Sequence, residues 1–157
     1  MEMSHQEKLA FKKTLHAGLV AKLRNNNAEL KGSIFELQDS AKSESKSSVG
    51  DKYETGRAMI QLEIEKITEQ LREKETALGV ISAMQVDVQD DTIRRGAVII
   101  TSEGTYFLSL SAGTVVIDHI TVSCISSSSP LGQMLLGRKS GDRVLINKRE
   151  VLVEKFF

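Results

Sequence analysis

The residues of this chain with the clearest chemical potential are two carboxylates, Asp51 and Glu54, which follow the turn-like run Ser47–Gly50. An aspartate with a glutamate three residues later is the pattern of a capping box, in which the two acids bind free N–H groups of a first helical turn. Carboxylates also suit the positive end of a helix dipole. The spacing alone therefore favours a capping role, and any further chemistry of this pair needs a second argument.

Three basic residues, Lys46, Lys52 and Arg57, lie beside these acids. Such cations could contact phosphate groups, although a solvated helix face explains each of them equally well. The 157-residue chain has 21 basic and 21 acidic residues, so its formal net charge is zero. It therefore has no general attraction to nucleic acid or to a membrane surface, and any electrostatic contact must be local.

The remaining candidates for catalysis, His16 and Cys124, have no evident catalytic partner. We expect His16 to be a packing residue. Cys124 is the single cysteine, so it excludes an internal disulfide framework. It lies in an apolar run with His119 as the nearest histidine, and a buried structural cysteine is expected rather than a thiol enzyme. The cysteine count favours a cytoplasmic location, and we expect neither a signal peptide nor a membrane-spanning segment.

The elements that position the carboxylates are predicted to be two helices. Residues 1–80 lack proline and are rich in Glu, Lys, Leu, Ala and Gln, which are good helix formers. Two series of residues alternate steps of four and three, which is typical of a coiled-coil seam. The series are His16, Val20, Leu23, Asn27, Leu30, Ile34, Leu37 and Ala41, and then Arg57, Ile60, Ile64, Ile67, Leu71, Lys74, Leu78 and Ile81.

The two series predict an antiparallel hairpin. Pairing Leu30 with Ile67 and Ile34 with Ile64 keeps the total of the two residue numbers nearly constant, and this places the fold-back near residue 49. The most turn-like stretch of this half, Ser47–Asp51, surrounds that position. The periodicity and the turn residues thus agree on a hairpin tip near residues 47–54.

Two polar residues interrupt the predicted seam. Asn27 would face Leu71, and Lys74 would face Leu23. A polar seam residue costs stability but fixes the register of the helices. Alternatively, these layers lie at the edge of the seam, where the stem of Lys74 covers apolar surface while its charge stays in water.

The second half of the chain has a different composition. From about Val86 onward Val, Ile, Thr, Ser and Gly dominate, which favours strands and tight turns. Ser129, Pro130 and Gly137 suit the cap, first turn and end of one short helix. Strands are expected at 97–101, 105–111, 115–118, 120–125, 143–146 and 149–156. The chain is therefore predicted to be an α+β protein with a coiled-coil hairpin, residues 1–85, and an antiparallel β-domain with one helix, residues 86–157.

These motifs resemble those of the bacterial Gre transcript-cleavage factors. Ser129–Gly132, Leu136–Gly137 and Gly141–Asp142 are similar to the C-terminal domain of that family. Gly50–Glu54 is similar to its hairpin tip, Gly-Asp-x-x-Glu, in both spacing and location. The resemblance covers roughly residues 30–157. The presence of both halves in this order is more specific than either half alone.

The resemblance implies an FKBP-like fold for the β-domain and a role in transcription elongation. It implies that the protein is not itself an enzyme but binds RNA polymerase, and with it DNA, and inserts the hairpin into the secondary channel. Asp51 and Glu54 would then share a Mg²⁺ ion with the polymerase and assist its cleavage of backtracked RNA. No membrane or small-molecule substrate is implied. The resemblance assigns polymerase contact to Ser129, Pro130, Leu131 and Gly132, and proximity to RNA to Lys46, Lys52 and Arg57.

The chain departs from the family after Glu54. In the family, the tip glutamate is usually followed by Asn, then another Glu and a Tyr. Here Thr55, Gly56, Arg57 and Ala58 follow, so Arg57 replaces the third acid, and the nearby tyrosine is Tyr53. A regulator that occupies the channel without promoting cleavage is therefore an alternative. A coiled-coil interaction protein unrelated to polymerase is another. A prolyl isomerase could share the fold, but its aromatic-lined pocket is hard to build without tryptophan.

Overall fold

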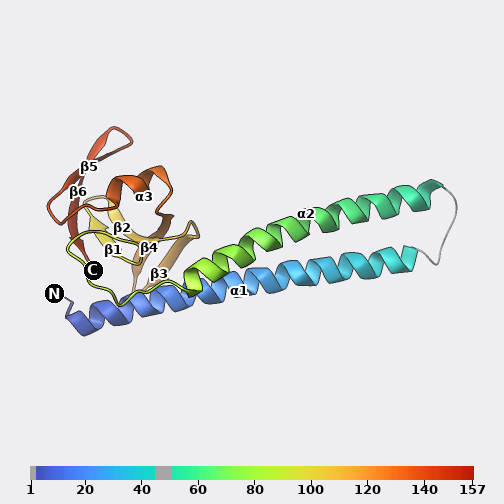
Figure 1. Cartoon of the computed structure of the whole chain (residues 1–157), viewed down its shortest axis with the longest axis horizontal. Coiled ribbons are helices and arrows are strands. Elements are labelled where there is room, and N and C mark those ends of the chain that lie inside the picture. Colours follow the sequence, from blue (N-terminus) through green and yellow to red (C-terminus); the bar gives the residue numbers. More distant parts are fainter. Residues whose placement is uncertain (1–2, 45–50) are drawn as a thin grey trace. The chain divides into compact units, whose positions relative to one another are not determined.

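The computed structural model describes residues 3–44 and 51–157, and two long helices occupy the first half of the chain. Helix α1 spans His5–Glu44 and helix α2 spans Asp51–Ser82 (Figure 1). The chain forms two compact units, a hairpin unit, Ala21–Val80, and a β-domain unit made of the residues up to Val20 together with Ile81–Phe157. Within the described residues, no helix has an apolar stretch long enough to cross a membrane.

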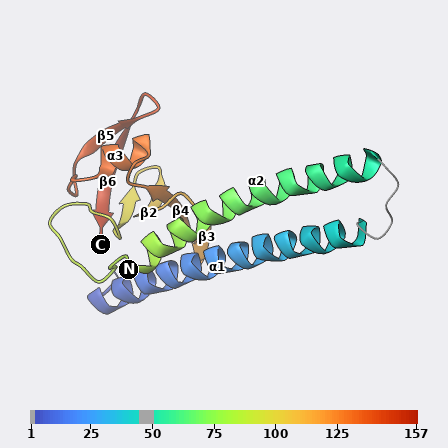
Figure 2. The ribbon, with the colours of Figure 1, turned by 45° about the vertical axis from the view of Figure 1, so that its right-hand side comes forward.

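In the hairpin unit, α1 and α2 run antiparallel, as Figures 1 and 2 show from two directions. The predicted seam is confirmed at most of its described positions, because its apolar residues are half-buried or buried while their neighbours are exposed. These seam residues are Leu23, Leu30, Ile34, Leu37, Ala41, Ile60, Ile64, Ile67, Leu71 and Leu78. Arg57 is exposed, so its assignment to the seam was wrong, whereas Lys74 is exposed as the edge alternative predicted. Because their charged ends remain in water, these side chains pay no desolvation penalty.

Asn27 is the polar residue that the seam does bury. Only 5% of it is exposed, and its Oδ1 atom has no hydrogen-bond partner among the described residues. Asn27 therefore lies inside the seam and not at its edge, unlike Lys74. A buried acceptor without a partner is destabilising, which makes this position a weak point of the hairpin.

The β-domain unit contains a six-stranded sheet in the order β3-β4-β2-β1-β6-β5. Its elements are β1 Val98–Thr101, β2 Gly104–Ser109, β3 Gly113–Ile117, β4 Ile120–Ser126, α3 Pro130–Leu135, β5 Arg143–Ile146 and β6 Arg149–Phe156. The prediction of an α+β fold with a β-sheet and one short helix is confirmed. The prediction of a purely antiparallel sheet is wrong, because β2 and β4 pair in parallel. The chain leaves β2, passes to the edge as β3, and returns as β4 between them.

Two tight turns shape the hairpins of this sheet. Asp118 and His119 join β3 to β4, and Asn147 and Lys148 join β5 to β6. All four residues have positive φ, at 49°, 67°, 50° and 66°. Two successive positive φ values are the signature of a type I′ turn, whose twist matches that of the flanking strands.

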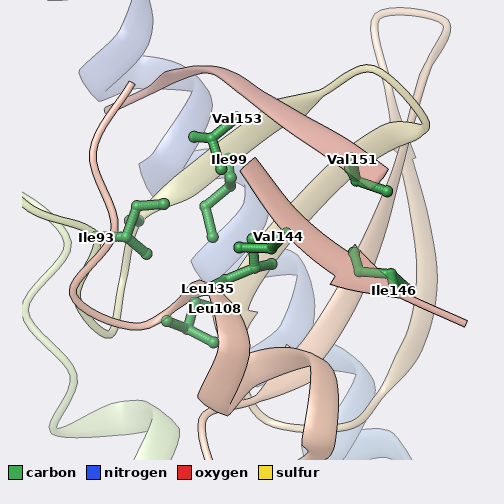
Figure 3. Close-up of a cluster of buried hydrophobic side chains, with 9 residues drawn as sticks. Ile93, Ile99, Leu108, Leu135, Val144, Ile146, Val151 and Val153 are labelled. Carbon is green, nitrogen blue, oxygen red and sulfur yellow. The ribbon is translucent and has the colours of Figure 1, made fainter. Parts of the chain in front are cut away.

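The core of the β-domain unit lies between the sheet and α3. Buried and exposed residues alternate along β5, whereas consecutive residues of β1 and β2 are buried, so both faces of these two central strands are covered. Figure 3 shows eight of the buried side chains, Ile93, Ile99, Leu108, Leu135, Val144, Ile146, Val151 and Val153. Leu135 of α3 belongs to this core, and Leu131 and Met134 of the same helix pack against it, so α3 closes one side.

The beginning of α1 belongs to the β-domain unit, although we expected a division near residue 85. Phe11, Leu15 and Leu19 are buried there. The ring of Phe11 meets that of Phe157 edge-on, with 6.2 Å between centroids, and the Nζ atom of Lys8 lies 5.7 Å from the same Phe157 ring. These contacts fix the first four turns of α1 to the end of the sheet.

His16 contributes to the same attachment. Its Nε2 atom lies 2.6 Å from the carbonyl oxygen of Ile81, and since a carbonyl only accepts, Nε2 must be the donor. The predicted packing role of His16 is confirmed. The two residues also occupy opposite ends of the predicted seam series, so this contact supports the antiparallel register.

Candidate functional site

The carboxylate pair lies in the first turn of α2. Asp51 is the first described residue of the helix, and Glu54 follows on an exposed position. The side chain of Asp51 and all of Lys46 lie outside the described residues. Two helical residues three apart are offset by about 60° around the axis and about 4.5 Å along it. The backbone positions of Asp51 and Glu54 therefore lie within one helical turn.

The start of α1 shows what a complete capping box looks like in this chain. The backbone N–H of Ser4 donates to Glu7 Oε2 at 2.6 Å, and the backbone N–H of Glu7 donates to Ser4 Oγ at 3.3 Å. These bonds hold the pKa of Glu7 below its usual value. Ser4 precedes the first helical residue of α1, whereas Asp51 is itself helical in α2. Residue 50 and the Asp51 side chain lie outside the described residues, so the predicted capping role of the α2 pair lies outside them too.

The basic residues near the pair are also exposed. Lys52 and Arg57 both face solvent, and Arg57 lies three residues, just under one turn, after Glu54. Among the side chains described from Lys52 onward, no ion pair engages Glu54 or Arg57. Both charges are thus available to an external partner such as a cation or a phosphate group.

Asp51 and Glu54 are the ligands that the sequence predicts for a Mg²⁺ ion. Within residues 3–44 and 51–157, no cluster of three or more His, Cys, Asp or Glu side chains could hold an ion. Asp51 and Glu54 supply carboxylate oxygens, which are the ligands that Mg²⁺ prefers. An octahedral ion would have to take most of its ligands from water or another molecule.

The run Ser129–Gly132 builds the start of α3. Ser129 Oγ accepts a bond from the Gly132 N–H at 3.1 Å and donates to the Ser126 carbonyl at 2.7 Å. Leu131 packs against the core. Gly132 is buried, and a Cβ atom there would lie 2.0 Å from the Ser126 oxygen. Of the four predicted polymerase-contacting residues, Pro130 is the one with an exposed side chain.

Two further residues extend the exposed side of α3 that Pro130 begins. Gln133 follows Pro130 by three positions and is exposed, and Leu136, just past the helix, is 45% exposed. Its neighbour Leu135 is fully buried. The sequence analysis placed Leu136 in the Leu136–Gly137 motif but did not predict that its side chain is exposed. A helical period over Pro130–Leu136 could have separated the two leucines.

A shallow open groove lies between α1 and α2 in the hairpin unit. It is lined by Asn26, Glu29, Leu30, Ser33, Gln70, Glu73 and Lys74. Its lining mixes acids, amides and one lysine. None of these groups has a nucleophile and base arranged as a hydrolytic enzyme needs. The groove therefore gives no support to an enzymatic site on the hairpin.

Two side chains of the β-domain unit, Lys12 and Tyr106, have pKa values that burial shifts. Burial lowers the pKa of Lys12, partly opposed by the nearby charge of Asp87, and Lys12 Nζ lies 3.5 Å from the Val88 carbonyl oxygen. Burial, with a smaller effect of Glu103, raises the pKa of Tyr106.

Comparison of the chain with protein-family models, with curated proteins and with solved structures finds no match. The argument for function therefore rests on the residues and their geometry.

Proposed function

We propose that this protein is a transcription elongation factor of the Gre type. It binds RNA polymerase in the cytoplasm through an FKBP-like β-domain and inserts the α1–α2 hairpin into the secondary channel. There it stimulates the polymerase to cleave backtracked RNA. The observation that carries this proposal is the exposed Glu54, beside Asp51 in the first turn of α2, at the end of the hairpin unit remote from Val80.

The tip carboxylates would act by completing a site that the polymerase begins. A second Mg²⁺ ion, when bound between factor and polymerase, would stabilise the attacking and leaving oxygens of RNA cleavage. Asp51 and Glu54 would orient this site from one side of α2. Lys52 would lie beside the RNA phosphates, whose charge it complements. For this task the protein needs no catalytic cleft of its own.

The β-domain would serve as the docking module. Pro130, Gln133 and Leu136 give α3 an exposed and partly apolar side that suits a protein partner. An isomerase would instead need open aromatic residues, but Phe107 is fully buried and Tyr106 and Phe156 pack against the core. A binding role is therefore better supported than catalysis on prolyl bonds.

A second candidate is a channel regulator without cleavage activity. Arg57 occupies the place where the family usually has a further acid, and it is exposed. A cation just under one turn from Glu54 would oppose the approach of Mg²⁺ while attracting RNA phosphate. Such a protein would fill the channel and compete with cleavage factors.

The test mixes the full-length protein with core RNA polymerase and then with a stalled, backtracked complex in Mg²⁺. Binding and shortening of the RNA 3′ end are the expected results. Binding without shortening supports the channel regulator. No binding, together with self-association through the hairpin, identifies a coiled-coil interaction protein and refutes the proposal.

A further inference from the structure

Strand β3 is one edge of the sheet, and the backbone groups of two of its five residues face away from the sheet. Its one neighbour in the described sheet is β4. Because a two-residue turn joins these strands, Ile117 and Ile120 form a hydrogen-bonded pair, and such pairs alternate along the hairpin. The N–H and C=O groups of Thr114 and Val116 therefore point outward. No hydrogen bond from another described residue meets them.

The side chains of β3 do nothing to block this edge. The strand Gly113–Ile117 contains neither a charge nor a proline, and three of its five residues are β-branched valine or isoleucine. Thr114 is exposed, and 65% of Val116 is exposed. Natural sheets usually protect an edge with charges, prolines or bulges, since an open edge is a template for another strand.

The opposite edge of the same sheet is protected. Strand β5 begins with Arg143, whose Nη1 atom lies 2.7 Å from Glu150 Oε2 on β6. Lys139 and Asp142 precede it. The difference between the edges points to pairing at β3 in particular.

We propose that β3 pairs with β3 of a second copy of this chain, antiparallel across a two-fold axis. In this pairing Val115 lies opposite Val115 of the second copy. Thr114 then lies opposite Val116 of that copy, and Val116 lies opposite its Thr114. Both are then hydrogen-bonded pairs, so every outward N–H and C=O of these two residues finds a partner. The register also places no like charges opposite each other, since Asp118 meets Ala112. The strand is thus complementary to itself, as a two-fold interface requires.

The resulting interface is small, because only one five-residue strand per copy takes part. Interfaces of this size are weak or transient. We therefore expect a concentration-dependent equilibrium between monomer and dimer. This inference is independent of the proposed role in transcription.

The experiment follows the full-length protein by sedimentation velocity over a wide concentration range, together with amide hydrogen exchange. The mean mass should rise with concentration, and exchange at Thr114 and Val116 should slow in parallel. Val116→Lys adds the charge that natural edges carry, and Val116→Pro removes an outward N–H while sparing the bonds to β4. Both variants should stay monomeric over the range in which the parent associates.

The matched controls are Leu145→Lys and Leu145→Pro on β5, where the residue is 64% exposed and its backbone groups also face outward. These variants should associate like the parent. Circular dichroism establishes that each variant is folded. A parent that stays monomeric throughout, a dimer that survives Val116→Lys, or protection of these amides that appears only on adding polymerase would overturn the inference.

Discussion

Replacing Asn27 by leucine should stabilise the hairpin unit. Asn27 is 95% buried, and its Oδ1 atom has no hydrogen-bond partner among the described residues. A buried polar group without a partner costs about 1–3 kcal/mol. The apolar replacement removes this cost, and it suits a seam in which Leu23 and Leu30 lie one turn away on either side. We expect the free energy of unfolding to rise by roughly 1–3 kcal/mol.

The measurement is urea unfolding followed by helical circular dichroism at 222 nm. Asn25→Leu is the matched control, because it makes the same chemical change at an exposed position of α1. A surface change of this kind should alter stability by no more than about 0.5 kcal/mol. If Asn27→Leu lowers stability, the Oδ1 atom has a partner in solution or the seam has no room for the larger side chain, and the reasoning fails.

The same substitution tests whether Asn27 sets the register of the helices. A single polar residue in an apolar seam disfavours shifted pairings in which it would meet only apolar groups. Asn27→Leu should therefore raise the stability of the hairpin while allowing the helices to pair in more than one register. Broadened amide signals of the hairpin in NMR spectra would reveal this loss, and unchanged sharp signals would show that the apolar residues alone fix the register.

Three further outcomes are expected. Gly132→Ala should destabilise the β-domain by about 1–3 kcal/mol in urea unfolding, since its Cβ atom would lie 2.0 Å from the Ser126 oxygen; an unchanged midpoint would contradict the crowding. Lys12→Met should raise stability at neutral pH. Because burial lowers the pKa of Lys12 in the folded state, the unfolded chain binds more protons between that pKa and 10.5. The parent therefore gains stability as pH rises through this window, and the advantage of the variant should shrink there. Paired cysteines at Ile34 and Ile64 should cross-link within one monomer, as a non-reducing gel will show; cross-links only between monomers would reject the register.

The hairpin was largely predictable because its signal is local. The four-three spacing of apolar residues directly gives the faces that pack. The prediction was wrong at Arg57, where the step pattern was followed without an apolar side chain to support it. It also overlooked the second apolar face of α1, formed by Phe11, Leu15 and Leu19 at steps of four, which is buried in the β-domain unit.

The sheet was predictable strand by strand but not in its order. Each strand has a local β-branched pattern, and the turns have local signals. The parallel pairing of β2 with β4 depends on where β3 and β4 insert, which is a non-local property. The position of the candidate site was also a local signal: sequence placed Asp51 and Glu54 at a helix start, and α2 begins at Asp51.

The most direct test of the proposed function is RNA cleavage in a backtracked polymerase complex with Mg²⁺, comparing the parent with Asp51→Asn and Glu54→Gln. Asparagine caps a helix about as well as aspartate, so Asp51→Asn removes the charge that Mg²⁺ requires while preserving the fold and polymerase binding. The proposal predicts that the parent shortens the RNA and that both variants bind polymerase without shortening it. If both variants cleave as fast as the parent, the carboxylates are structural and the proposed mechanism is wrong.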